Sequence, residues 1–298
     1  MTLRYTALAS GSRGNSSLVQ VSGTSLLIDA GLPLQELEKR CLLAGKSLAP
    51  VQAILLTHTH SDHWNDGLLG WLCRERKPLF CHPSHHSVLA RFSRHFDKLH
   101  TTGLLRSFEP GTPFEIAPGV TGLAVPVRHD GGETFGFRID GPRDLFGQGQ
   151  ALAHLSDLGT WDDDLAESMA EVDLLAVEFN HDLILERQST RPAFLVARVL
   201  SDEGHLSNDQ AARFLQRVLS RTTPGRLRHV VQLHLSEDCN RPALARKAAS
   251  DILREHEFQV QIQTAEQYRP GRTLHLNPGL ARRRVVGTAP SEGLPPRG

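Results

Sequence analysis

The chain has 298 residues, 39% of them hydrophobic and 22% charged, which is enough for one large or two small domains with a hydrophobic core. Lys plus Arg equals Asp plus Glu at 33 each, so the net charge of zero gives no overall field to attract a polyanion, although a local basic rim would suffice. No apolar run is long enough to span a bilayer, the N-terminus lacks a signal-peptide pattern, and the four cysteines have no CxxC spacing, so we predict a cytoplasmic protein with no membrane partner.

The first half of the chain alternates strands and helices. Apolar segments at 6–10, 17–21 and 24–31 predict strands, and 33–45 predicts a helix with Pro33 in its first turn and Gly45 at its end. The apolar run 51–56 predicts a buried strand, and an amphipathic helix is expected over 64–76. A further strand and helix are expected within 79–92.

The second half is richer in strands. Strands are predicted at 114–116, 120–127, 134–139, 151–157, 172–180 and 227–236, and helices at 161–171, 208–220 and 241–256. Ser207 or Asn208 would cap the helix 208–220. This mixture predicts α/β layers in one domain over residues 1–276. Residues 277–298 contain three consecutive arginines, several prolines and no apolar period, which predicts a disordered C-terminal tail.

The segment His58-Thr59-His60-Ser61-Asp62-His63 follows the strand 51–56 directly. Three imidazoles and a carboxylate this close together cannot all be core side chains, and these donors suit Zn²⁺, Mn²⁺ or Fe²⁺. Residues two apart on an extended segment point the same way, so His58 and His60 can share one ion, whereas Asp62 and His63 face a second position. The alternative, a polar surface turn, is disfavoured by the buried strand before it and the amphipathic helix after it.

This HxHxDH segment resembles the signature of hydrolases with the metallo-β-lactamase fold, a four-layered αββα sandwich. The resemblance implies two divalent metal ions, zinc or manganese, held by side chains that follow successive strands. It assigns one ion to His58, His60 and His129, the second to Asp62, His63 and His234, and a bridging position to Asp157. Asp29, at the end of the strand 24–31, would orient the HxHxDH segment through hydrogen bonds.

Local matches narrow the resemblance to one branch of that fold. The segments SGSRGNSS, HDGGETFGF, EFNHD, GHLSN and HLSEDCNRP are similar to the YycJ/WalJ (VicX) group, whose members are described as DNA-directed nucleases or uncharacterised hydrolases. The similarity runs from Leu3 to about Leu276. His63 after Asp62 argues against the classical β-lactam hydrolases, and the 77 positions from Asp157 to His234 are too few for the inserted domain of β-CASP nucleases.

Further site residues follow from these motifs. GHLSN resembles the His-Ser/Thr motif of tRNA 3′-processing nucleases, which implies that His205 assists cleavage of the phosphodiester; the alternative is that His205 only begins the helix 208–220. Asp62 is also predicted to be catalytic. Glu178 and His181 are expected to support His205 or His234. The glycine-containing loop SGSRGNSS can approach a phosphate backbone, so substrate contacts are predicted for Ser12, Arg13 and Asn15. Histidines 82, 85, 86, 95 and 100 match no ligand set and are expected on a solvated or groove-facing helix.

We therefore predict a two-metal-dependent hydrolase, a phosphodiesterase of exonuclease type that acts on DNA or another phosphodiester through a metal-bound hydroxide. The alternative among enzymes is a small-molecule hydrolase of the same fold: a cyclic or nucleotide phosphodiesterase, a thioesterase or a lactonase. The alternative outside enzymes is a metal-binding regulatory module, against which the complete ligand set argues. The sequence itself reveals no clear stacking platform for a nucleic-acid strand.

Overall fold

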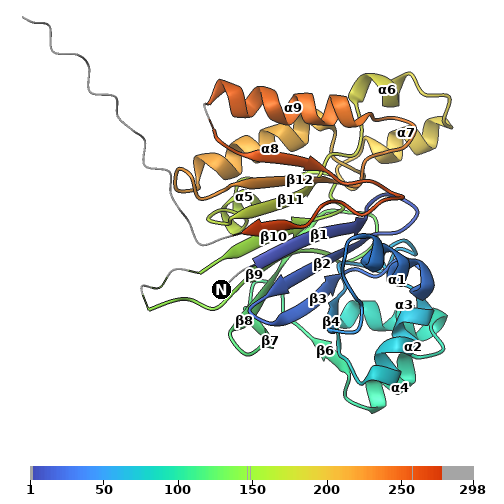
Figure 1. Cartoon of the computed structure of the whole chain (residues 1–298). Helices are drawn as coiled ribbons and strands as arrows, with labels where there is room; N and C mark the ends of the chain where they lie inside the picture. Colours follow the sequence, from blue (N-terminus) through green and yellow to red (C-terminus); the bar gives the residue numbers. More distant parts are fainter. Residues whose placement is uncertain (1–2, 146, 148, 257, 277–298) are drawn as a thin grey trace, which may run out of the picture.

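A computed structural model describes residues 3–145, 147, 149–256 and 258–276. Within these residues two seven-stranded sheets lie face to face, and helices cover their outer surfaces (Figure 1). The predicted four-layered αββα sandwich is therefore confirmed. The predicted tail, 277–298, lies outside the described residues. Among the helices of the described ranges, none is both long and apolar enough to cross a membrane.

The first sheet has the strand order β14-β1-β2-β3-β4-β5-β6. The pairings from β14 to β3 are antiparallel, and those from β3 to β6 are parallel. Its strands are β1 (Leu3–Ala9), β2 (Ser16–Val21), β3 (Thr24–Ile28), β4 (Val51–Leu55), β5 (Leu79–Cys81), β6 (Leu105–Ser107) and β14 (Leu274–Leu276).

The second sheet has the order β13-β12-β11-β10-β9-β8-β7, and its pairings from β10 to β13 are parallel. Because parallel strands end at the same edge of a sheet, the residues that follow β10, β11 and β12 are brought together there. Its strands are β7 (Phe114–Ala117), β8 (Val120–Val127), β9 (Thr134–Asp140), β10 (Ala151–Leu155), β11 (Leu174–Glu178), β12 (His229–Leu233) and β13 (Gln261–Thr264).

The helices divide between the two outer layers. Three apolar clusters hold the layers together: one lies between the sheets around Tyr5 and Phe137, one under α8 and α9, and one under α1 and α2. The helices are α1 (Leu34–Leu43), α2 (Asp66–Glu75), α3 (His86–Phe92), α4 (Phe96–Thr101), α5 (Asp163–Ser168), α6 (Leu183–Arg187), α7 (Ala193–Val199), α8 (Asn208–Ser220) and α9 (Pro242–Glu255), with a 3-10 turn at Pro83–His85.

Helix ends near the site follow local rules. Ser207, one of the two predicted caps, begins α8 with a capping box in which its hydroxyl accepts from the Gln210 N–H. Asp182 accepts hydrogen bonds from the N–H groups of Ile184 and Leu185 and so caps α6. The helices α6 and α7 between β11 and α8 were not predicted from the sequence. Both lie at the edge of the molecule where β11 ends (Figure 1).

Candidate metal centre

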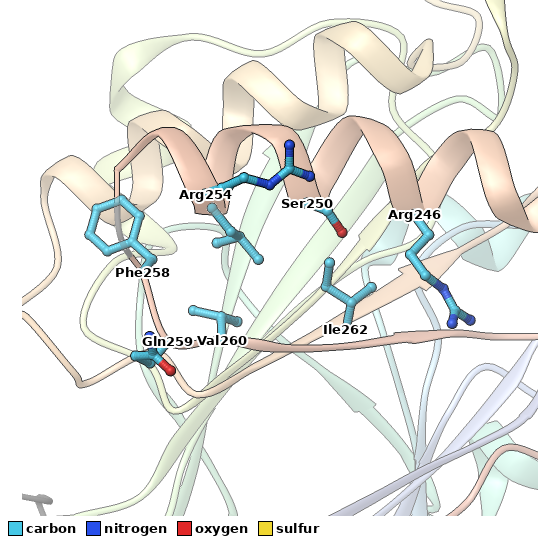
Figure 2. A pocket seen from close by; sticks show the side chains of 8 residues that line it. Arg246, Ser250, Arg254, Phe258, Gln259, Val260 and Ile262 are labelled. Atoms are coloured by element: carbon cyan, nitrogen blue, oxygen red, sulfur yellow. The ribbon is translucent and has the colours of Figure 1, made fainter.

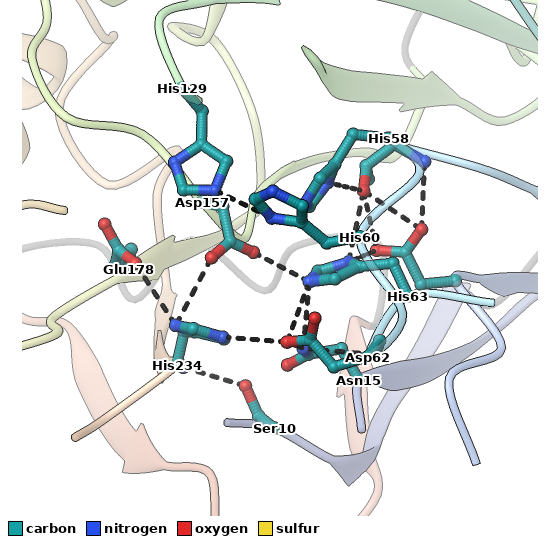
Figure 3. A network of polar contacts seen from close by, with 12 residues as sticks. Ser10, Asn15, His58, His60, Asp62, His63, His129, Asp157, Glu178 and His234 are labelled. Atoms are coloured by element: carbon teal, nitrogen blue, oxygen red, sulfur yellow. Dashed lines mark hydrogen bonds and ion pairs between the residues drawn. The ribbon is translucent and has the colours of Figure 1, made fainter. Parts of the chain in front are cut away.

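The predicted metal-binding side chains converge at one edge of the sandwich, where they form a single polar cluster (Figure 3). The HxHxDH segment follows β4 and reaches it from the first sheet. Asp157 and His234 follow β10 and β12 of the second sheet, and His129 follows β8. The cluster is thus built across the gap between the sheets, with donors from segments up to 176 positions apart, from His58 to His234.

His58, His60 and His129 form the first triad, with one nitrogen from each within 4.8 Å of the others. His60 Nδ1 lies 3.3 Å from His129 Nε2. The second nitrogen of His129, Nδ1, is 2.9 Å from the carbonyl oxygen of Gly204, and Thr57 Oγ1 is 2.9 Å from His58 Nδ1. These bonds fix two of the rings so that the remaining nitrogens face the middle of the triad.

Asp62, His63 and His234 form the second triad. Asp62 Oδ2 is 3.5 Å from His63 Nε2 and 3.5 Å from His234 Nε2. Asp157 lies between the two triads, because its Oδ2 is 3.0 Å from His63 Nε2 and it also groups with His58. The two sets of three side chains and the central carboxylate have the arrangement that the resemblance implied.

Asp29 lies directly behind the second triad. Its Oδ2 is 2.7 Å from His63 Nδ1, and its Oδ1 accepts hydrogen bonds from the backbone N–H and hydroxyl of Thr57. This contact turns His63 Nε2 toward Asp62 and Asp157. Asp29 and His234 both adopt the left-handed backbone region, with φ of 59° and 51°, which costs about 1–3 kcal/mol for a residue other than glycine. Such strain persists because the surrounding contacts hold these two side chains in place.

Glu178 and His205 occupy the side of the cluster formed by the second sheet. His205 Nδ1 is 2.7 Å from Glu178 Oε1, which also lies 3.4 Å from His234 Nδ1. Glu178 Oε2 accepts from the Leu206 N–H at 2.8 Å, so the carboxylate is fully engaged. The other predicted supporting residue, His181, is buried but makes no side-chain hydrogen bond in the described part of the chain; its carbonyl oxygen instead accepts from the Asn208 N–H.

The loop predicted to contact substrate divides into two parts. Ser12 and Arg13 are exposed, and Arg13 Nε donates to Glu237 at 3.2 Å. Asn15 is buried, and its Nδ2 lies 3.2 Å from Asp62 Oδ2 and 2.9 Å from His63 Nε2. Asn15 therefore orients two side chains of the cluster, whereas substrate contact by all three loop residues stays a prediction.

Sequence reasoning missed several supporting residues. Asn180 Nδ2 lies 3.2 Å from His234 Nδ1 and donates to the His234 carbonyl oxygen, while Ser10 Oγ accepts from the His234 N–H. Thr57 joins Asp29 to His58. Asp130 Oδ1 lies 3.5 Å from His129 Nε2. Thr57 and Asp130 adjoin predicted ligands in sequence, and Ser10 and Asn180 lie within two of the quoted motifs, which is the signal that could have found them.

The charges in the cluster depend strongly on one another. Burial alone would raise the pKa of Asp157, but His234 and His63 hold that pKa well below its usual range. Burial likewise opposes charge on His234, yet Asp157, Asp62 and Glu178 raise its pKa to about 10. Burial lowers the pKa of His58 well below its usual range. The buried carboxylates therefore require positive charge beside them, which divalent cations provide.

Some buried ligand atoms of the cluster have no hydrogen-bond partner among the described residues, which bears on whether the cluster can hold a metal. His58 Nε2, His234 Nε2 and Asp157 Oδ2 are buried and lack a hydrogen bond of good geometry, although His63 Nε2 lies 3.0 Å from that Asp157 oxygen. Buried polar atoms without hydrogen bonds are rare in folded proteins. Imidazole nitrogen and carboxylate oxygen are ligands for zinc and manganese. The donor set and its orphaned atoms fit divalent cations.

Gly31 sets the position of the HxHxDH loop. A Cβ at this position would overlap the carbonyl oxygen of Asp62. We expect Gly31→Ala to lower the free energy of unfolding by about 1–3 kcal/mol and to weaken metal binding, because the loop must move. Thermal unfolding and metal titration measure both effects. Gly67→Ala, where a Cβ approaches only the flexible Asn65 side chain, is the control, and equal behaviour of the two variants would contradict the assigned role.

A separate groove of about 860 Å³ runs between α9 and β13 (Figure 2). Its walls combine Arg246 and Arg254 with apolar side chains such as Phe258 and Ile262. Among the residues that the structure describes, none that lines the groove belongs to the cluster, and none is a histidine or a carboxylate. The groove is therefore not part of the candidate metal centre.

Comparison with known proteins agrees with this geometry. The model of the beta-lactamase superfamily domain matches residues 24–224. Exodeoxyribonuclease YycJ of Bacillus anthracis is 29% identical over 265 residues, covering 87% of this chain and 92% of that protein. Exodeoxyribonuclease WalJ of Streptococcus pneumoniae is 27% identical over 264 residues, covering 87% and 91%. The metallo-β-lactamase-fold protein YhfI from Bacillus subtilis superposes with a TM-score of 0.65 at 17% identity, covering 92% of this chain and all of that one, which establishes the shared fold.

Proposed function

Because the chain belongs to the metallo-β-lactamase superfamily, in the branch that contains YycJ and WalJ, we propose that it is a metal-dependent phosphodiesterase that degrades DNA from its ends. The two triads that meet at Asp157 carry this proposal, since they provide donors for two cations side by side. Curated relatives that are named exodeoxyribonucleases align over 87% of the chain and support DNA as the substrate.

The geometry of the cluster supports a division of the ligands between two cations. His58, His60 and His129 would hold one cation, Asp62, His63 and His234 the other, and Asp157 both. Two cations, zinc or manganese, would polarise the phosphoryl group and activate water at neutral pH. Asp62 would also act as the general base. It is less buried than Asp157, so its second oxygen can accept a proton from the attacking water.

His205 would act on the leaving group. Its Nδ1 is held by Glu178 at 2.7 Å, which leaves Nε2 for the substrate. Its ring stacks beside that of His234, with centroids 5.2 Å apart, so it borders the cluster directly. A positioned imidazole can donate a proton to the departing sugar oxygen. Ser12, Arg13 and Asn15 remain the proposed contacts to the phosphate backbone.

We also propose that the protein works in the cytoplasm. All four cysteines are free and buried in the structure. Burial raises the pKa of the Cys81 thiol to about 12, which keeps this group protonated and unreactive. A set of unpaired thiols suits a reducing compartment.

The direct test uses end-labelled DNA with Mn²⁺ or Zn²⁺. We expect release of mononucleotides or short products from single- or double-stranded DNA, because a protein without net charge grips few phosphates. EDTA should abolish the reaction, and added metal should restore it. Labelled RNA and bis(p-nitrophenyl) phosphate serve as comparison substrates.

One outcome would replace the substrate but keep the site. If DNA and RNA stay intact while a cyclic phosphodiester, a thioester or a lactone is hydrolysed with kcat/KM above about 10⁴ M⁻¹s⁻¹, the protein is a small-molecule hydrolase. If no metal binds and none of these substrates is cleaved, the enzyme assignment fails and a regulatory module takes its place.

A further inference from the structure

An unusually exposed phenylalanine lies on the short helix α7. Phe194 is 75% exposed, although phenylalanine is normally among the buried residues. Ala193 and Ala197 beside it are exposed and small, so the ring is open to solvent on α7. Val199 is the buried residue of this helix, so Phe194 is not required to anchor α7 to the core.

The same helix is linked to the metal centre through an ion pair. Arg198 pairs with both carboxylate oxygens of Asp130. The Asp130 Oδ1 atom lies 3.5 Å from His129 Nε2 and 3.8 Å from His60 Nε2. Phe194 and Arg198 are one helical turn apart, so they share a face of α7. Phe194 therefore lies one helical turn from the arginine that reaches Asp130 at the edge of the cluster.

Arg198 retains binding capacity. Its Nε and Nη2 donate to Asp130, which leaves Nη1 without a partner in the part of the chain that the structure describes. The side chain is 49% exposed. A guanidinium with free N–H groups beside a cluster of metal ligands is suited to a phosphate oxygen.

We propose that Phe194 and Arg198 form the strand-binding wall of the site, in which the ring stacks on a base of single-stranded DNA and the guanidinium holds an adjacent phosphate. This inference rests on the proposed function and names the residues that distinguish a nucleic-acid strand from a small phosphodiester. Cβ atoms one turn apart are about 5–6 Å from each other, which lets the two side chains engage neighbouring parts of one strand. The Phe194 ring also supplies the stacking platform that was not evident from the sequence.

Binding of an uncleaved strand tests the wall apart from catalysis. The probe is a fluorescein-labelled decathymidylate with phosphorothioate linkages, titrated into the metal-loaded protein and followed by anisotropy. Loss of one stacked aromatic side chain should weaken binding about tenfold in Phe194→Ala. Phe194→Trp should bind as the wild type does, because it keeps an aromatic face. Phe194→Leu should behave as Phe194→Ala, because it keeps apolar area without the ring.

Matched controls show whether the effect belongs to this surface. Phe92 on α3 has a similar exposure of 61%, so Phe92→Ala removes an equivalent ring elsewhere and should leave binding unchanged. With cleavable DNA, Phe194→Ala should lower kcat/KM about tenfold relative to its kcat/KM for bis(p-nitrophenyl) phosphate. In Arg198→Gln, the slope of the logarithm of the binding constant against the logarithm of the salt concentration should become smaller by about one.

Several outcomes would overturn the wall. The proposal fails if Phe194→Ala or Phe194→Leu binds the strand as tightly as the wild type does. It also fails if the salt dependence of binding is unchanged in Arg198→Gln, or if the wild type does not bind the strand. Light scattering that shows a wild-type dimer and a Phe194→Ala monomer would assign the ring to an interface between copies of the chain. Strand binding without degradation of cleavable DNA would leave the wall standing and refute only the nuclease proposal.

Discussion

Asp157→Asn is expected to remove bound metal and hydrolytic activity together. Asp157 lies between the two triads, and its negative charge is shared by His63 and His234. Asparagine keeps the shape but loses the charge, so both cations should bind more weakly. Metal ions contribute several kcal/mol to catalysis, so kcat/KM should fall by about 10³-fold or more. Elemental analysis and turnover of labelled DNA measure the two losses.

The same substitution should also destabilise the metal-free protein. The pKa of His234 is raised to about 10 chiefly by Asp157, against burial, so the variant leaves a buried positive charge without its main partner. Breaking a buried ion pair in this way costs about 3–5 kcal/mol, measurable by urea unfolding in EDTA.

Asp173→Asn is the matched control for Asp157→Asn. Asp173 is equally buried, but it precedes β11 at the opposite end of the sheet and pairs with Arg226 and Arg228. Its loss should lower stability and leave metal content intact. Two equivalents of metal in Asp157→Asn would refute the central position assigned to this carboxylate.

The convergence of the cluster was predictable because it depends on topology. His58 to His63 form a local motif, and Asp157 and His234 follow β10 and β12. Those strands are parallel, so their ends meet at one edge wherever the connecting helices lie. The resemblance identified these donors, and the shared strand ends explain why they meet at one edge of the sandwich.

The helices α6 and α7 were not predictable by the same means. They have five and seven residues, and two of their large apolar side chains, Ile184 and Phe194, are exposed. A segment that turns apolar residues outward shows no amphipathic period, which is the main sequence signal for a helix. For this reason the sequence did not predict the two helices at the rim of the site.

The interpretation of the histidines between 82 and 100 was wrong in two respects: His82 and His95 lie outside the helices, and His85 is not solvated. His85 was expected on a solvated or groove-facing helix, but it is buried, and its Nε2 donates to the Glu133 carbonyl oxygen at 2.7 Å. Its ring also contacts Phe135 of β9. Both partners lie about fifty positions further along the chain, so no local pattern could reveal this packing.

His205→Ala is expected to lower kcat on DNA by about a hundredfold or more while metal content and fold stay unchanged. His205 belongs to neither predicted metal triad, and Glu178 holds its Nδ1 at 2.7 Å with Nε2 left for the substrate. A general acid matters most when the leaving group is a poor one. Hydrolysis of bis(p-nitrophenyl) phosphate, whose leaving group departs readily without a proton, should therefore fall by much less than hydrolysis of DNA.

The ratio between the two substrates separates the roles open to His205. An equal loss on both substrates would mean that the imidazole stabilises charge on phosphorus and does not protonate the leaving oxygen. Loss of metal would mean that His205 is itself a metal ligand. One of its nitrogens lies within 4.8 Å of ligand atoms of Asp157, Glu178 and His234. His256→Ala, at an exposed position after α9, is the control and should change neither substrate. Wild-type turnover of DNA by His205→Ala would reduce His205 to a residue that only leads into α8, because Ser207 and Gln210 already form the cap without it.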